Sequence, residues 1–125
     1  MTKLVVVCVL GVSGCGVLAV PDQAIIAVAA WSQTTGESEG CRINAMQHCV
    51  AASAVSAQCG PACAVLLGRL LEIRQLDGDP MDLHNNEAGA DCGLAIEGDP
   101  DNAITCCEEL LNSDPPKLRT DGRCD

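Results

Sequence analysis

Apolar side chains recur at helical spacing through most of the chain. Between residues 41 and 57 they return every three or four positions, at Ile43, Met46, Val50 and Ala54. This spacing is typical of an amphipathic helix. Three further stretches continue the pattern, and each follows a proline that suits the first position of a helix: Pro61, Pro80 and Pro100. No alternating β-branched run follows residue 31. The sequence therefore predicts an all-α fold of about four short helices, packed as two hairpins.

The first 40 residues have a different pattern. After Lys3 the chain is apolar up to Val20, is interrupted at residues 21–23, and is apolar again up to Trp31. One basic residue before an apolar run is typical of a secretory signal, so we assign residues 1–31 to a leader. Residues 32–40 carry no large apolar side chain and predict a flexible linker. Residues 41–125 then form a cysteine-rich helical domain.

The leader contains three candidate processing sites. Val12-Ser13-Gly14-Cys15 resembles the lipobox of bacterial lipoproteins, which implies that Cys15 is lipidated and becomes the first mature residue. Cleavage after Ala19 or after Ala29 competes with it, since small residues precede both positions. An uncleaved anchor is the remaining alternative, although the interruption at residues 21–23 breaks the run of roughly 20 apolar residues that a bilayer requires. We expect an exported protein that is either a membrane-anchored lipoprotein or secreted into the periplasm or beyond.

Cysteine is abundant while aromatic residues are almost absent. The chain has 10 Cys and one Trp but no Phe or Tyr, so its apolar core is small and cross-links would strengthen it. Eight cysteines follow the leader, and an even number in a small exported domain predicts up to four disulfides among them: Cys41, Cys49, Cys59, Cys63, Cys92, Cys106, Cys107 and Cys124. Their spacing leaves the pairing open.

Two other functions of the cysteines are disfavoured by spacing. A zinc finger requires C-x-x-C pairs or an equivalent Cys/His cluster, and the sequence has neither. Cys59-Gly60-Pro61-Ala62-Cys63 resembles a thioredoxin active site, but three residues separate its cysteines where thioredoxin has two. We interpret this pair as structural.

The charge balance excludes one class of partner. The chain has 17 acidic and 7 basic residues, a formal net charge of −10, which would repel a nucleic acid backbone. A cationic partner, a protein partner or a divalent metal ion is compatible with this charge, and no cofactor is required by the sequence. The simplest interpretation is a solvated acidic surface that keeps an exported protein soluble.

Polar side chains on three of the predicted helices could form a site. An imidazole close to carboxylates is common in hydrolytic sites, so the candidate catalytic residues are His48, Glu72 and Asp82. The neighbouring amides are candidate binding residues: Asn44, Asn85 and Asn86. The alternative is structural, because such amides also cap and bridge helices, and Asp82 in a first turn interacts favourably with the helix dipole.

Burial of one amide predicts how these groups are arranged. Asn85 lies on the apolar stripe of its helix, and an unpaired buried amide costs about 1–3 kcal/mol. The first helix offers Asn44 and His48 beside its apolar stripe. We therefore expect these two side chains to face Asn85 and either Asp82 or Asn86, with Glu72 nearby. His84 lies about 200° around the helix from Asp82 and should point away.

The same residues resemble a bacterial domain of unknown function. Asn44-Ala45-Met46-Gln47-His48, then Glu72, then Met81-Asp82-Leu83-His84-Asn85-Asn86-x-x-Gly89 are similar to its pattern N-A-F-R-H, H-E and M-D-L-x-N-N-x-x-G. That domain recurs in exported proteins and at the C-termini of polymorphic-toxin-like proteins. The resemblance covers residues 44–93, and the chain departs from the pattern at Met46, Gln47, Leu71 and Ala90.

Two functions follow from these observations. The first is an exported, disulfide-stapled helical module of the bacterial cell envelope with a binding or structural role. The second is a small hydrolase or toxin-like effector that uses His48, Glu72 and Asp82. Because the resemblance implies no reaction, the arrangement of the polar residues has to distinguish them. An open pocket would favour the hydrolase, whereas buried and mutual hydrogen bonding would favour the module.

Overall fold

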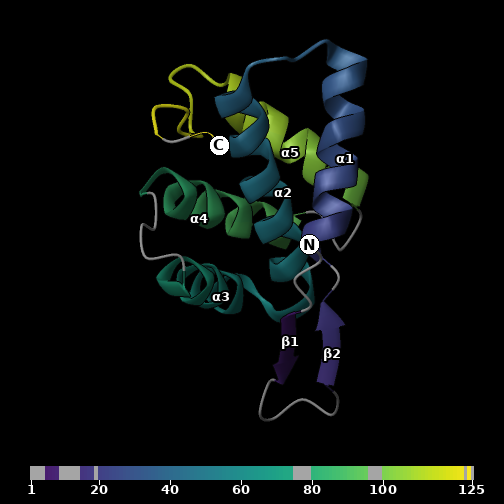
Figure 1. The fold of residues 1–125 in the computed structure, drawn as a ribbon, viewed down its shortest axis with the longest axis vertical. Helices are drawn as coiled ribbons and strands as arrows, with labels where there is room; N and C mark the ends of the chain where they lie inside the picture. Colours follow the sequence, from purple (N-terminus) through teal and green to yellow (C-terminus); the bar gives the residue numbers. More distant parts are fainter. Residues whose placement is uncertain are drawn as a thin grey trace.

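Four helices surround one central helix, α2 (Gly40–Cys59), in the part of the chain that the structure describes (Figure 1). This computed structural model describes residues 5–8, 15–18, 20–74, 80–95, 100–122 and 124. Within them the helices are α1 (Val20–Thr35), α2 (Gly40–Cys59), α3 (Pro61–Arg74), α4 (Pro80–Ala95) and α5 (Pro100–Asn112). Each of the other four helices contacts α2. The predicted all-α bundle is confirmed, with α1 as an additional helix.

Proline and glycine set the helix boundaries. Pro61, Pro80 and Pro100 are the first residues of α3, α4 and α5, where a missing backbone N–H costs nothing and the fixed φ suits a helix. Helix α2 ends at Gly60, which adopts φ 89°. This backbone conformation is accessible to glycine but unfavourable for residues that carry a Cβ. The Gly60 N–H donates to the carbonyl oxygen of Ser56 at 2.7 Å and closes the last turn.

Helix α1 lies largely within the expected leader and packs against the helical domain. Its buried side chains, Ala24, Val28 and Trp31, are four and three residues apart and join the same core as α2 and α5. The indole Nε1 of Trp31 also donates to Glu108 Oε2 at 2.9 Å. The apolar composition of residues 24–31 conceals this amphipathic stripe, because a leader and a buried helix face share the same residue types.

The segment expected to be a linker, residues 32–40, includes helical residues and several polar contacts. Residues 32–35 form the last turn of α1. From that turn, Ser32 Oγ donates to the carbonyl oxygen of Glu37 at 2.7 Å. The Glu37 carboxylate in turn pairs with Arg42 of α2, with Nε 2.7 Å from Oε2. The hydrogen bond from Arg42 lowers the pKa of the Glu37 carboxyl below its usual value. These contacts fix the path from α1 into α2.

Two short strands lie within the expected leader. Strand β1 (Val5–Cys8) pairs with β2 (Cys15–Leu18) in an antiparallel hairpin, in which Val5 faces Leu18 and Cys8 faces Cys15. Removal of this segment as a leader stays a prediction.

Small residues allow α2 and α4 to pack closely. Gly89 and Gly93 lie one turn apart on α4 and face α2. A Cβ at Gly89 would overlap the backbone of Cys49, and one at Gly93 would overlap the Ser56 side chain. Hydroxyl groups then cross the contact: Ser53 Oγ donates to the carbonyl oxygen of Gly89 at 2.8 Å, and Ser56 Oγ donates to that of Ala90 at 2.6 Å. This contact sets the distance between the polar faces of the two helices.

Disulfides link all eight cysteines that follow residue 40. The bridges are Cys41–Cys124, Cys49–Cys107, Cys59–Cys63 and Cys92–Cys106. The predicted framework is therefore confirmed, and it indicates an extracellular or otherwise oxidising environment. In the described part of the chain, none of the helices combines the length and apolarity needed to cross a membrane.

Candidate functional site

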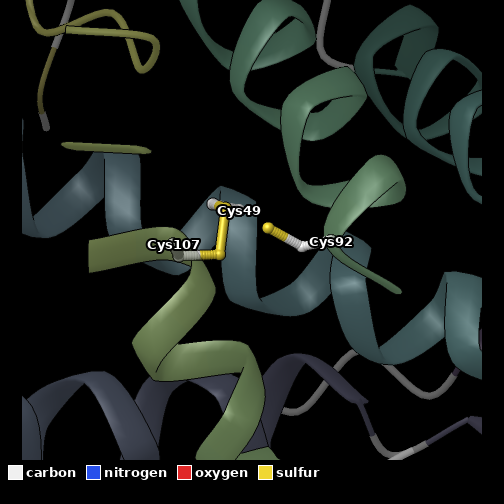
Figure 2. A group of neighbouring side chains, drawn as sticks. All are labelled: Cys49, Cys92 and Cys107. Carbon is white, nitrogen blue, oxygen red and sulfur yellow. A yellow bond between two sulfur atoms is a disulfide. The ribbon is translucent and has the colours of Figure 1, made fainter. Parts of the chain in front are cut away.

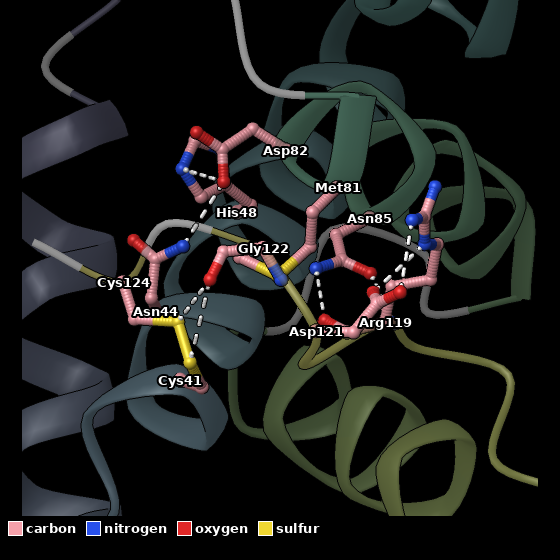
Figure 3. The surroundings of a disulfide bond; sticks show 10 residues. All are labelled: Cys41, Asn44, His48, Met81, Asp82, Asn85, Arg119, Asp121, Gly122 and Cys124. Atoms are coloured by element: carbon pink, nitrogen blue, oxygen red, sulfur yellow. Dashed lines mark hydrogen bonds and ion pairs between the residues drawn. A yellow bond between two sulfur atoms is a disulfide. The ribbon is translucent and has the colours of Figure 1, made fainter.

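The polar cluster lies where the first half of α2 faces the first turns of α4. His48 Nε2 is 3.2 Å from Asp82 Oδ1, and His48 Nδ1 is 3.1 Å from Asn86 Oδ1. Asn44 Nδ2 donates to the same Asp82 oxygen at 3.0 Å, as Figure 3 shows. The expected convergence of His48 and Asn44 on Asp82 and Asn86 is therefore confirmed. We call these four residues the polar cluster.

Helical spacing accounts for the shape of the cluster. Asn44 and His48 are four residues apart on α2, and Asp82 and Asn86 are four apart on α4, so each pair lies on one face of its helix. Asp82 is also in the first turn of α4, where the partial positive charge of the helix N-terminus stabilises a carboxylate. The close α2–α4 contact brings the two pairs within hydrogen-bonding distance.

Both ring nitrogens of His48 are engaged. A neutral ring protonated at Nε2 donates to Asp82 and requires a donor at Nδ1, which a rotated Asn86 amide supplies. A doubly protonated ring donates to both oxygens without any rotation. The side chains are partly buried, with 27% of His48 and 16% of Asp82 exposed. The cluster is therefore a satisfied network at the edge of a helix contact.

Asn85 has a different partner from the one expected. It is fully buried, as its position on the apolar stripe of α4 predicted. Its Nδ2 donates to the carbonyl oxygen of Arg119 at 2.9 Å, while its Oδ1 accepts from the Arg119 N–H at 2.8 Å. The expectation that Asn85 faces His48 is wrong, because only helices were considered as sources of partners. The C-terminal segment supplies both a backbone donor and a backbone acceptor.

That C-terminal segment is held along α4. His84 Nε2 donates to the carbonyl oxygen of Lys117 at 2.8 Å, so His84 points away from the polar cluster as predicted. The Gly122 N–H contacts Met81 Sδ at 3.2 Å, and Leu118 is buried in the core. These contacts fix the tail together with Asn85 and the Cys41–Cys124 bridge, and Figure 3 shows those of Met81, Asn85 and the bridge. The sequence signal for a fixed tail was Cys124 near the end of the chain, whereas the contact of the tail with Asn85 was not expected.

Two predicted site residues fall outside the part whose side chains the structure describes. Glu72 belongs to α3, but the position of its side chain is not among the described features, so its role stays a prediction. Cys15 is the first residue of β2, and its side chain is likewise outside the described set, as are lipobox residues 12–14.

Comparison with known proteins found no matching family model, no matching curated protein and no matching solved structure. The resemblance to a bacterial domain of unknown function stays a prediction based on the residues quoted above.

The polar cluster is expected to stabilise the fold through coupled interactions. The His48→Gln and Asp82→Asn substitutions should each lower the free energy of unfolding by about 1–2 kcal/mol. The reason is that the hydrogen bond between these two side chains involves a carboxylate that is partly shielded from water. The double variant should lose about 1 kcal/mol less than the sum of the two. Urea unfolding of the oxidised protein measures all three values.

His84→Gln provides a matched control for this cycle. His84 is exposed and lies on α4, the helix that carries Asp82, but its hydrogen-bond partner is the backbone carbonyl of Lys117 in the tail. It should show no coupling to Asp82→Asn. Strict additivity of the His48 and Asp82 substitutions would contradict the described network.

Proposed function

We propose that the protein is an exported, disulfide-stapled helical module of the bacterial cell envelope with a binding or structural role. The observation that carries this proposal is the engagement of His48 at both ring nitrogens. In the part of the chain with described side chains, each buried side-chain nitrogen or oxygen also has a hydrogen-bond partner. A network that satisfies itself in this way supports stability and a fixed surface.

The alternative is a hydrolase that uses His48, Glu72 and Asp82. A general base needs one ring nitrogen directed at a nucleophile while the other is held by an orienting group. Here Asp82 could be the orienting group, but the second nitrogen contacts the Asn86 amide, which is not a nucleophile. The geometry therefore favours the module over the hydrolase.

The position of α1 bears on which processing site is used. Cleavage after Ala29 would remove Ala24 and Val28, both of which are buried in the core. Cleavage at Cys15 or after Ala19 would leave α1 in place. Because loss of buried apolar side chains typically costs several kcal/mol in a small domain, the core supports processing upstream of α1. This is compatible with Cys15 as the lipidated residue.

Membrane association is expected to depend on Cys15. In a bacterial host, Cys15→Ala should move the protein from the membrane fraction to the soluble envelope fraction, because the acyl chains that anchor it are no longer attached. Fractionation followed by mass spectrometry of the N-terminus measures both location and lipid. The control is Cys8→Ala, which alters a cysteine in the same apolar run without touching the lipobox. Unchanged membrane retention of Cys15→Ala, or absence of lipid on the wild type, would refute the lipoprotein assignment.

A further inference from the structure

Three helices bring cysteines into one buried group. Cys49 of α2, Cys92 of α4 and Cys107 of α5 have Sγ atoms that all lie within 4.8 Å of one another (Figure 2). Two of them are completely buried and Cys92 is 3% exposed. Cys106 joins the group because its Sγ is bonded to that of Cys92 at 2.05 Å. In the oxidised protein, these four residues form two neighbouring disulfides.

We propose that the reduced protein binds one Zn²⁺ ion through the thiolates of Cys49, Cys92, Cys106 and Cys107. Thiolates around tetrahedral zinc have Zn–S bonds of about 2.3 Å, which places the sulfur atoms about 3.8 Å apart. Three of the four sulfurs already lie within 4.8 Å of one another. The fourth, Cys106 Sγ, is bonded to Cys92 Sγ in the oxidised protein and would have to rotate towards the other three after reduction.

The surroundings favour a closed, structural site for a soft metal. Four thiolates select zinc over hard cations such as magnesium or calcium, which prefer oxygen ligands. Ser53 Oγ lies 3.6 Å from Cys107 Sγ, and its hydroxyl hydrogen could turn from the carbonyl oxygen of Gly89 to a thiolate there. The ion would also offset the negative charge of four thiolates, three of them buried and that of Cys106 partly buried, which the reduced core could not otherwise keep ionised. The spacing of the ligands along the chain conceals the site, because no C-x-x-C pair contributes to it.

Oxidation would exchange the ion for the two disulfides. Each bridge forms when two zinc-bound thiolates become one S–S bond and release two electrons. A low-molecular-weight disulfide accepts these electrons and becomes two thiolates. Two such disulfides are consumed per chain, and one Zn²⁺ ion is released. The reduced and oxidised proteins then share one fold, held at the same place first by a metal and later by covalent bonds.

Cobalt is the spectroscopic probe for this site. Full-length protein with Cys8 and Cys15 replaced by Ser, reduced with a phosphine under argon, should bind one Co²⁺ per chain and develop thiolate charge-transfer and tetrahedral d–d absorption. Zn²⁺ should displace the cobalt and remove the bands. Cys92→Ser should lose most of the tetrathiolate signal. The matched control is Cys59→Ser with Cys63→Ser, which removes two cysteines that lie outside the proposed site. This variant should still bind one Co²⁺ per chain.

A second measurement uses protein without substitutions in the core, so its result does not depend on whether the Cys92→Ser variant folds. X-ray absorption of the zinc-loaded protein should show four sulfur ligands at about 2.3 Å, and addition of a small disulfide should release one zinc per chain to a chromophoric chelator. A nitrogen or oxygen coordination shell, zinc retained after both core bridges have formed, or equal loss of cobalt binding in the Cys59/Cys63 variant would overturn the proposal.

Discussion

Replacement of Cys49 and Cys107 by Ala is expected to lower the free energy of unfolding by about 4 kcal/mol. The bridge spans 58 residues, and in the chain-entropy model its loss returns that closed loop to the unfolded ensemble. Both residues are completely buried, so their removal also disturbs packing between α2 and α5. Because the chain is small and has one aromatic residue, its apolar core contributes little to the free energy of unfolding, and the loss of a bridge is a large fraction of the total. Urea unfolding monitored by circular dichroism should show a much lower midpoint.

The Cys59–Cys63 bridge is the control for this prediction. It spans only 4 residues, so the same model assigns it about 2 kcal/mol, roughly half the effect. Its position between α2 and α3 leaves the central core intact. Equal losses from the two double substitutions would show that the length of the closed loop does not determine the contribution of these bridges.

Gly89→Ala is expected to destabilise the protein by about 3 kcal/mol even though alanine is the better helix former. Helix propensity alone would favour the substitution by about 1 kcal/mol. The added Cβ, however, overlaps the backbone of Cys49, which cannot move without displacing α2. Separation of α2 and α4 would also weaken the Ser53 and Ser56 hydrogen bonds to α4. Overpacking therefore outweighs propensity.

Gly40→Ala tests the same substitution where space is available. Its nearest neighbour is the carbonyl oxygen of Cys124 at 3.6 Å, an ordinary contact distance. Thermal unfolding should show a change within about 0.5 kcal/mol for Gly40→Ala and a clear drop for Gly89→Ala. A Gly89→Ala variant as stable as the wild type would mean that α2 and α4 do not pack as closely as described.

The sequence predicted the features that depend on local patterns. Prolines marked the starts of α3, α4 and α5, apolar spacing identified α2, and the even number of cysteines indicated up to four bridges, all of which are present. The pairing of His48 with Asp82 was also predictable, because both lie beside the apolar stripes of their helices.

The remaining features depend on contacts between distant segments. Most of helix α1 falls in the segment assigned to a leader by its composition, and its packing against α2 and α5 could not be predicted from that composition. The partner of Asn85 was missed because the segment that carries Arg119 has no periodic pattern. The grouping of Cys49, Cys92 and Cys107 depends on three helices meeting, which no spacing along one helix can show.

The Cys41–Cys124 bridge makes a covalent ring of the chain between those two residues. A protease that cuts once inside this ring opens a peptide bond but releases no fragment, because both new ends remain attached through the bridge. The hydrogen bond of Asn85 to the tail and the burial of the tail residue Leu118 in the core would keep many such ends in place. Release of a fragment from this ring would then require either two cuts within it or reduction first, which gives the protein a longer lifetime among proteases than its small core alone would provide.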